Sequence, residues 1–360
     1  MLKKSIVFLL VVFSLIVILP TDRPVAARQT TPDAQFRLIQ MVLPQADVWL
    51  DGEIIWAGLH YVITSDSAVI EPGSHTIAIS ATGSTEPIAS VELEVEEGHQ
   101  YTIATMGEYE TPTPELVVID ETTVLANYQD TGSNAIIIQN GSGAPPVDVF
   151  FVDTIVITEL GFGEYGIAAA PLGLFHAGAT AVGQPDSVLF ESEYFAVPGT
   201  TAIAYLTGTF PDIHRNFFTS TQDNMPDYLL ASAALPESRV SVLVDLLTTT
   251  GLLELLDQGE FTLFAPNNAA FAAQTEGLFN LDDPTTLAEV MSYHIVPEYL
   301  SPNDLVGEHT VTSLNGATLD VAYTPGESFT VNAIANLVLQ FRVGNGIIYL
   351  IDTVLAPPTE

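Results

Sequence analysis

Two stretches near the C-terminus decide the fold of the last third of the chain: FTLFAPNNAAF, residues 261–271, and NGIIYLIDTVL, residues 345–355. In the first stretch a short β-rich run from Phe261 to Phe264 is stopped by Pro266, and Asn267 or Asn268 can cap the helix that follows. This stretch therefore predicts a strand-to-helix corner, a structural motif without catalytic chemistry.

The second stretch predicts a tight hairpin. Asn345 and Gly346 tolerate the positive φ that a two-residue turn requires. After them Ile347, Tyr349 and Ile351 alternate, which places their side chains on one face of the returning strand.

Helical patterns surround the corner. Apolar residues recur at i, i+3, i+4 and i+7 from Val240 to Leu247, and Gly251 follows as a stop. Asp283 is placed to cap a second helix that has Pro284 in its first turn and His294 on its apolar face. From residue 310 onward the pattern returns to strands, so residues 226–357 are predicted to form one α+β domain.

The two stretches, with Tyr293-His294 between them, resemble the signature of the fasciclin domain family. The resemblance implies an extracellular adhesion module. It also marks a set of motif residues for interaction or structure: Phe264, Pro266, Asn268, Tyr293, His294, Asn345, Gly346 and Asp352. For His294 two roles stay open, a buried ring held by a hydrogen bond or a share in partner contact. The chain departs from the family in having Asn267 instead of threonine and Tyr349 instead of histidine.

The first half of the chain contains an internal repeat. Asp47-Val48-Trp49-Leu50 returns as Asp148-Val149-Phe150-Phe151, and His75 returns as His176 at the same offset. Short alternating runs separated by turn signals predict two tandem antiparallel β-sandwich repeats, at residues 36–130 and 134–222. The strand Ala46 to Leu50 followed by Asp51-Gly52 resembles the bacterial secreted family called domain of unknown function 4397.

The N-terminus has the layout of a secretory signal peptide. Lys3 and Lys4 precede an apolar run from Ile6 to Leu19, and small residues end at Ala27. We expect residues 1–27 to be cleaved and the protein to be extracellular, either released or held at the cell surface. The alternative is an uncleaved anchor, but the run is shorter than a membrane span requires.

Composition limits the partners. The chain has no cysteine and a net charge of −36, from 44 acidic and 8 basic residues. The absence of cysteine excludes disulfides and a lipid-modified N-terminal cysteine, and the charge disfavours nucleic acid and anionic lipid. Carboxylates are calcium ligands, so calcium is the only cofactor we retain, as a minor alternative to a solvated acidic surface.

Other sites fit the sequence poorly. Gly161 to Gly166 matches the spacing of a dinucleotide-binding loop, but it lies in a β-repeat where no helix can receive the pyrophosphate. The seven histidines have no spacing typical of zinc ligands. We therefore predict no catalytic residues and no metal site.

The sequence predicts a secreted, non-catalytic binding protein. Two β-sandwich repeats would present a fasciclin-like domain to a cell-surface or matrix protein or glycan, or to a second copy of the chain. Two alternatives stay open: a carboxylate-dependent polysaccharide hydrolase and a purely structural envelope component.

Overall fold

The computed structural model describes residues 33–111, 113–126, 132–210, 212–273 and 283–358. The predicted signal peptide, residues 1–27, lies outside the described residues. In the part that is described, no helix is long and apolar enough to cross a membrane.

The first region, here called repeat 1, is a two-sheet sandwich. Its sheets have the strand orders β4-β1-β7-β8 and β3-β2-β5-β6. Its elements are β1 (Gln35–Ile39), β2 (Gln45–Leu50), β3 (Glu53–His60), β4 (Ala68–Val69), β5 (Gly73–Ala81), β6 (Ala89–Val95), β7 (Gln100–Met106), β8 (Glu115–Asp120) and the short helix α1 (Glu121–Leu125). Phe36, Ile77, Ile79 and Ile103 fill the space between the sheets.

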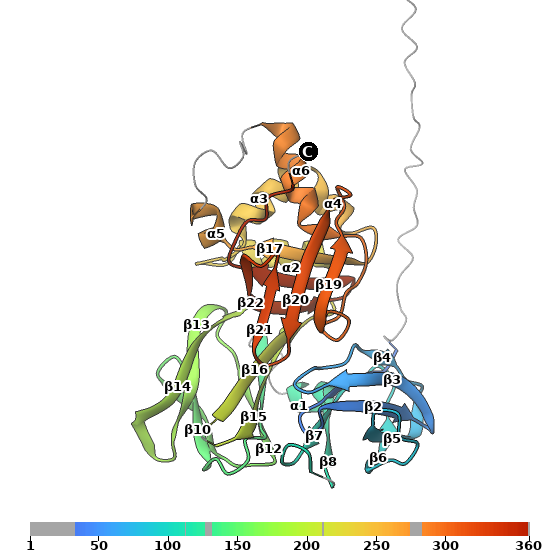
Figure 1. Cartoon of the computed structure of the whole chain (residues 1–360). Helices are drawn as coiled ribbons and strands as arrows, with labels where there is room; N and C mark the ends of the chain where they lie inside the picture. The colour runs from blue at the N-terminus through green and yellow to red at the C-terminus, as the bar shows by residue number, and fades with distance from the viewer. Residues whose placement is uncertain (1–32, 112, 127–131, 211, 274–282, 359–360) are drawn as a thin grey trace, which may run out of the picture.

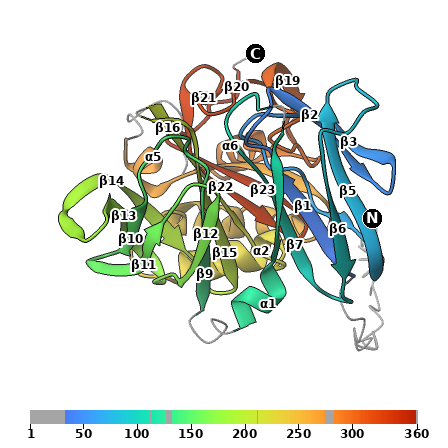
Figure 2. The same ribbon diagram turned by 90° about the horizontal axis from the view of Figure 1, so that it is seen from below.

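The second region, repeat 2, has the corresponding strand orders β12-β9-β15-β16 and β11-β10-β13-β14. Its strands are β9 (Ser133–Gln139), β10 (Val147–Phe151), β11 (Thr154–Leu160), β12 (Glu164–Ala169), β13 (Gly173–Ala181), β14 (Gln184–Ala196), β15 (Thr200–Thr209) and β16 (Asp212–Ser220). The two repeats lie side by side (Figures 1 and 2).

The sandwich architecture is confirmed, but the prediction of wholly antiparallel sheets was wrong in one respect. β1 pairs with β7 in parallel, and β9 pairs with β15 in parallel. The reason is the route of the chain: between the two parallel strands each repeat builds all four strands of the other sheet, and such a crossover permits parallel pairing. Alternation within a strand does not reveal the direction of its neighbour.

One buried carboxylate has the same role in both repeats. Asp47 accepts hydrogen bonds from the backbone N–H of Gly58 and of Gly83, both at 2.8 Å. Asp148 accepts the same pair of bonds, from Glu159 and Gly183, also at 2.8 Å. Each carboxylate thereby joins a bulged strand to a hairpin turn.

The C-terminal region is an α+β domain. It comprises α2 (Met225–Ala233), α3 (Ser241–Thr249), α4 (Leu252–Leu255), β17 (Phe261–Pro266), α5 (Asn268–Ala273), α6 (Pro284–Tyr293), β18 (Ile295–Val296), β19 (Gly307–Thr312), β20 (Thr318–Thr324), β21 (Ser328–Val331), β22 (Ala335–Val343) and β23 (Gly346–Ile351). As the sequence predicts, the side chain of Asp283 caps α6 by accepting from Thr286 N–H. Leu263, Ile348 and Leu350 face the helices, whereas Phe264, Ile347 and Tyr349 face the core under β19 to β21.

The three regions form one body. β16 of repeat 2 pairs in parallel with β22 of the C-terminal domain, so one sheet runs through both. Repeats 1 and 2 share a buried apolar cluster that includes Ile39, Met106, Ile138 and Phe218. The C-terminal domain is thereby held above the paired sandwiches, with α3, α5 and α6 at the end far from the repeats (Figure 1).

Candidate functional site

The predicted strand-to-helix corner lies inside the C-terminal domain. β17 pairs in parallel with β23 over its whole length, from Phe261 opposite Gly346 to Pro266 opposite Ile351. Phe264 is fully buried, and its ring stacks on Tyr349 with the ring centres 5.7 Å apart. The two sequence stretches are therefore adjacent strands of one sheet.

The two asparagines of the corner have different roles. Asn267 caps α5, because its side-chain oxygen accepts from Ala270 N–H at 2.8 Å. Asn268 instead reaches α3: its oxygen accepts from Val242 N–H, and its nitrogen donates to Ser238 O and Ser241 Oγ. Since α3 has no side-chain cap of its own, Asn268 supplies one from across the corner.

Tyr293 is the last residue of α6, and its hydroxyl lies between β20 and the turn that follows β21. The hydroxyl donates to the carbonyl of Thr318 at 2.8 Å and accepts from Asn332 Nδ2 at 2.9 Å. The ring packs with Phe264 and Tyr349 in the core under β19 to β21. Tyr293 thus fixes α6 on the sheet.

His294 is fully buried and makes hydrogen bonds with both ring nitrogens. Nδ1 lies 2.7 Å from the carbonyl of Val290, and Nε2 lies 2.9 Å from the backbone nitrogen of Leu355. An amide can only donate, so Nε2 is the acceptor and Nδ1 carries the proton. Burial lowers the pKa of His294 to about 4, although the Val290 carbonyl opposes the shift. The ring is neutral and inaccessible to a partner.

The hairpin at residue 345 differs from the prediction. Val343 pairs with Gly346, so the two-residue loop is Gly344-Asn345, and Gly346 already belongs to β23. Neither glycine has a left-handed φ. Residue 346 must be glycine for another reason, the close approach of the neighbouring strand. A Cβ at this position would lie 2.2 Å from the carbonyl oxygen of Phe261.

Asn345 connects this hairpin to the helices. Its side-chain oxygen accepts from Met225 N–H at 2.6 Å, and its nitrogen donates to the carbonyls of Leu256 and Gly259. These contacts satisfy backbone groups at the start of α2 and after α4, which would otherwise lack a helical partner.

Asp352 closes the opposite end of β23. Its carboxylate accepts from the backbone and side-chain nitrogens of Asn336, at 2.8 and 2.9 Å. Partial burial works to raise the pKa of Asp352, but the bonds from Asn336 and Thr353 outweigh it and lower the pKa. The motif residues are therefore framework: they order strands and helix ends, and none forms an exposed cluster of reactive groups.

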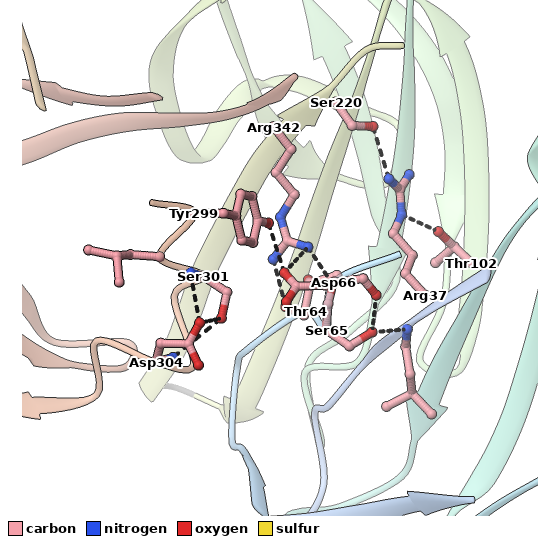
Figure 3. A network of polar contacts seen from close by, with 12 residues as sticks. Arg37, Thr64, Ser65, Asp66, Thr102, Ser220, Tyr299, Ser301, Asp304 and Arg342 are labelled. Atoms are coloured by element: carbon pink, nitrogen blue, oxygen red, sulfur yellow. Dashed lines mark hydrogen bonds and ion pairs between the residues drawn. The ribbon is translucent and has the colours of Figure 1, made fainter. Parts of the chain in front are cut away.

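The sequence reasoning missed the polar junction at which the three regions meet (Figure 3). Arg342 of β22 donates to the carbonyls of Thr64 and Ser65 in repeat 1. Tyr299 donates to Asp66 Oδ1 at 2.8 Å, and Arg342 lies 3.8 Å from the same carboxylate oxygen. Burial raises the pKa of Asp66 against the opposing effect of Arg342.

A second arginine completes the junction. Arg37 of β1 pairs with Glu121 at 2.7 Å and donates to Ser220 Oγ of repeat 2 at 3.0 Å. The only sequence signal for these residues is their rarity: of 8 basic residues, four arginines lie in the described part of the chain. Two of the four are buried at this junction.

In the described ranges, no group of three or more histidine, cysteine, aspartate or glutamate side chains is arranged to hold a metal ion. The carboxylates discussed above are engaged with backbone amides, arginines or side-chain amides. They serve to hold turns and modules together.

Comparison with known proteins gives two family matches. Residues 238–357 match the family described as "Fasciclin domain", and residues 34–150 match "Domain of unknown function (DUF4397)". The second match covers repeat 1 and the first two strands of repeat 2.

Three relatives illustrate the similarity. An uncharacterized protein of Synechocystis sp. is 31% identical over 129 residues, which are 35% of this chain and 96% of that protein. The cell surface glycolipoprotein MPB83 of Mycobacterium bovis is 32% identical over 140 residues, 36% of this chain and 61% of MPB83. Human periostin is 32% identical over 143 residues, 39% of this chain but 16% of periostin. The chain therefore spans most of the first relative and only part of the others.

Proposed function

Since this chain belongs to the fasciclin family, we propose that it is a secreted, non-catalytic adhesion protein in which the fasciclin domain is the interaction unit. The observation that carries the proposal is the way in which the fasciclin domain is attached to the two sandwich repeats. Continuous sheet pairing between β16 and β22 and the buried Arg342 junction fix it on the two sandwiches. The helix α2 packs against Phe195 and Val197 of repeat 2, whereas α3, α5 and α6 lie at the end far from the repeats (Figure 1).

An extracellular location is part of the same proposal. Relatives named as a cell surface glycolipoprotein and as periostin support an extracellular setting. The N-terminal segment 1–27 would direct export and then be removed. A cell-surface or matrix protein or glycan, or a second copy of the chain, would be the partner.

The binding surface must be built from the outward side chains of the domain, because most of the motif residues are buried and the polar ones are engaged in hydrogen bonds within the domain. In the described part of this domain three large apolar side chains are exposed, and the two most exposed are Leu230 on α2, at 48%, and Ile334 in the turn between β21 and β22, at 56%. Exposed apolar groups of this kind contribute to protein–protein contact when they gather with polar neighbours.

Binding of the mature chain to cells of its own source, measured with the fluorescently labelled protein, tests this assignment. We expect Leu230→Glu or Ile334→Glu to lower binding, and the matched variant Ile54→Glu in repeat 1, where the side chain is 47% exposed, to leave it unchanged. Thermal melting of all three variants should match the parent. If only Ile54→Glu lost binding, the binding surface would lie in the repeats and the proposal would be overturned.

A further inference from the structure

The core of repeat 2 contains alanines where repeat 1 contains large side chains. The two repeats can be aligned through their pairing. Val48 pairs with Ile79 and Leu50 with Ile77 in repeat 1, whereas Val149 pairs with Ala179 and Phe151 with Ala177 in repeat 2. Two large residues of β5 have thus become alanines in β13.

The parallel strands show the same change. Gln40 and Gln139 mark equivalent positions, because the side-chain oxygen of each accepts from the backbone N–H two residues later. Counting back, Phe36 corresponds to Ala135. Their parallel neighbours extend the comparison: Tyr101 and Ile103 of β7 correspond to Ala202 and Ala204 of β15.

These five alanines line an apolar cavity of about 60 Å³ between the two sheets of repeat 2. Phe151, Phe175 and Phe190 also line it and fill part of the space that the small side chains leave. Well-packed cores rarely leave such a void, because its walls lose their contact partners. The cavity therefore results from the small residues that repeat 2 has at positions where repeat 1 has large apolar ones.

A larger pocket of about 290 Å³ adjoins the cavity. Val147, Phe190, Leu206 and Arg215 line both spaces and form their common wall. At the rim Leu189 and Phe210 are 49% and 55% exposed. The outer pocket is near the lower end of the size range of small-molecule sites, about 300 Å³.

Arg215 gives this apolar space a charge. In the described part of the chain, Arg37, Arg239 and Arg342 each pair with a carboxylate, and Arg215 has no such pair. Its guanidinium lies over the ring of Phe190, 5.4 Å from the ring centre. By strand pairing Arg215 stands where repeat 1 has the buried Leu116. The protein as a whole repels anions, because its net charge is −36. An arginine without a carboxylate partner is therefore a position at which an anionic ligand can bind.

A donor lies near it. Gln139 lines the outer pocket, and its Nε2 is buried without a hydrogen-bond partner. The equivalent atom of Gln40 in repeat 1 is also unpaired, so this donor belongs to both repeats. Arg215 is what distinguishes repeat 2.

We propose that repeat 2 binds a single-chain apolar molecule that ends in one carboxylate. The carboxylate lies in the outer pocket against Arg215, whose planar guanidinium matches it in a two-point hydrogen bond. The chain lies along Phe190 and enters the space left by Ala135, Ala177, Ala179, Ala202 and Ala204.

Titration calorimetry of the full mature protein with octanoate tests this proposal. Two controls are used: 1-octanol, which lacks the carboxylate, and acetate, which lacks the long apolar chain. Octanoate should bind, octanol should bind about tenfold more weakly because one charge-assisted contact is lost, and acetate should give no signal. Equal binding of octanoate and octanol, or no binding of octanoate, would overturn the proposal.

Variants locate the site. Arg215→Gln should weaken octanoate binding about tenfold, and Arg215→Lys should restore only part of it, because the charge is kept but the two-point hydrogen bond and the stacking on Phe190 are lost. Ala204→Ile, which introduces the residue of repeat 1, should abolish binding and melt no earlier than the parent because it fills the cavity. Ala179→Ile gives a second test if that variant fails to fold. Unchanged affinity in a folded cavity-filling variant would contradict the assignment.

Discussion

Arg342 of the fasciclin domain lies over the ring of Phe218 in repeat 2, with its guanidinium carbon 5.4 Å from the ring centre. The guanidinium of Arg37 from repeat 1 lies 5.1 Å from the same ring. One aromatic side chain is thus the meeting point of cations from the other two regions. Both arginines are held by acceptors, Arg37 by Glu121 and Arg342 by the Thr64 and Ser65 carbonyls.

We predict that Arg342→Met separates the melting of the fasciclin domain from that of the repeats. The apolar stem is kept, but the carbonyls of Thr64 and Ser65 lose their donor in a buried site, at a cost of about 2–4 kcal/mol. Differential scanning calorimetry should show two transitions. The control Arg239→Met removes a pair with the exposed Glu193, which is worth about 0–1 kcal/mol. A single unshifted transition in Arg342→Met would show that β16–β22 pairing alone couples the domains.

His294 should make the fasciclin domain less stable in mild acid. Its pKa is about 4 in the folded state and about 6.5 when exposed. Between these values the unfolded chain binds a proton that the folded chain does not, so stability falls as pH drops from about 6.5 to about 4, by up to about 3 kcal/mol. Urea unfolding across this range measures the slope.

Carboxylates also titrate near pH 4. The contribution of His294 is therefore measured as the difference between the parent and His294→Gln in how the free energy of unfolding changes with pH. The variant should be less stable at pH 7, because the bonds to Val290 and Leu355 are lost, and should lack the slope above pH 5. An identical slope in both proteins would assign the acid sensitivity to other groups.

Gly346→Ala should destabilise the fasciclin domain by about 3 kcal/mol, because the new Cβ would require the β17 and β23 backbones to separate. Gly259→Ala is the matched control: its Cβ would meet only the Phe261 ring, at 3.4 Å. Thermal unfolding should shift strongly for the first variant and by less than about 1 kcal/mol for the second. Comparable melting of the two would mean that the sheet can open at this point.

Adhesion should depend on cations. With a net charge of −36, copies of the chain and acidic surfaces repel one another, and at 0.15 M salt this repulsion extends over about 8 Å. Calcium can also bridge carboxylates of two molecules, since it accepts six to eight oxygens. We expect weak binding to cells at low ionic strength, and recovery by millimolar calcium beyond that from sodium chloride of equal ionic strength. A steady fall in binding as sodium chloride rises would point to a basic partner.

The sequence predicted local features of the fasciclin domain well. The Asp283 cap of α6 and the strand-to-helix corner depend on residues within a few positions of one another, so the chain specifies them without help from the rest of the fold. The hairpin loop was placed one residue too late. Gly344 and Asn345 form it because Gly346 is needed in β23, where the backbone of Phe261 comes close, and that neighbour is distant in the sequence.

The amino-acid sequence by itself determined the β-rich composition, the acidic surface, the absence of disulfides and the family of the C-terminal domain. Only the tertiary structure decided that most of the motif residues are buried, that Arg342 reaches Ser65, 277 residues away, and that five alanines of three strands surround one cavity. The physical reason is that periodicity and capping are local properties of a chain. A cavity or a buried ion pair arises from strand pairing across long loops, and its energy depends on partners that the pattern within one segment does not contain.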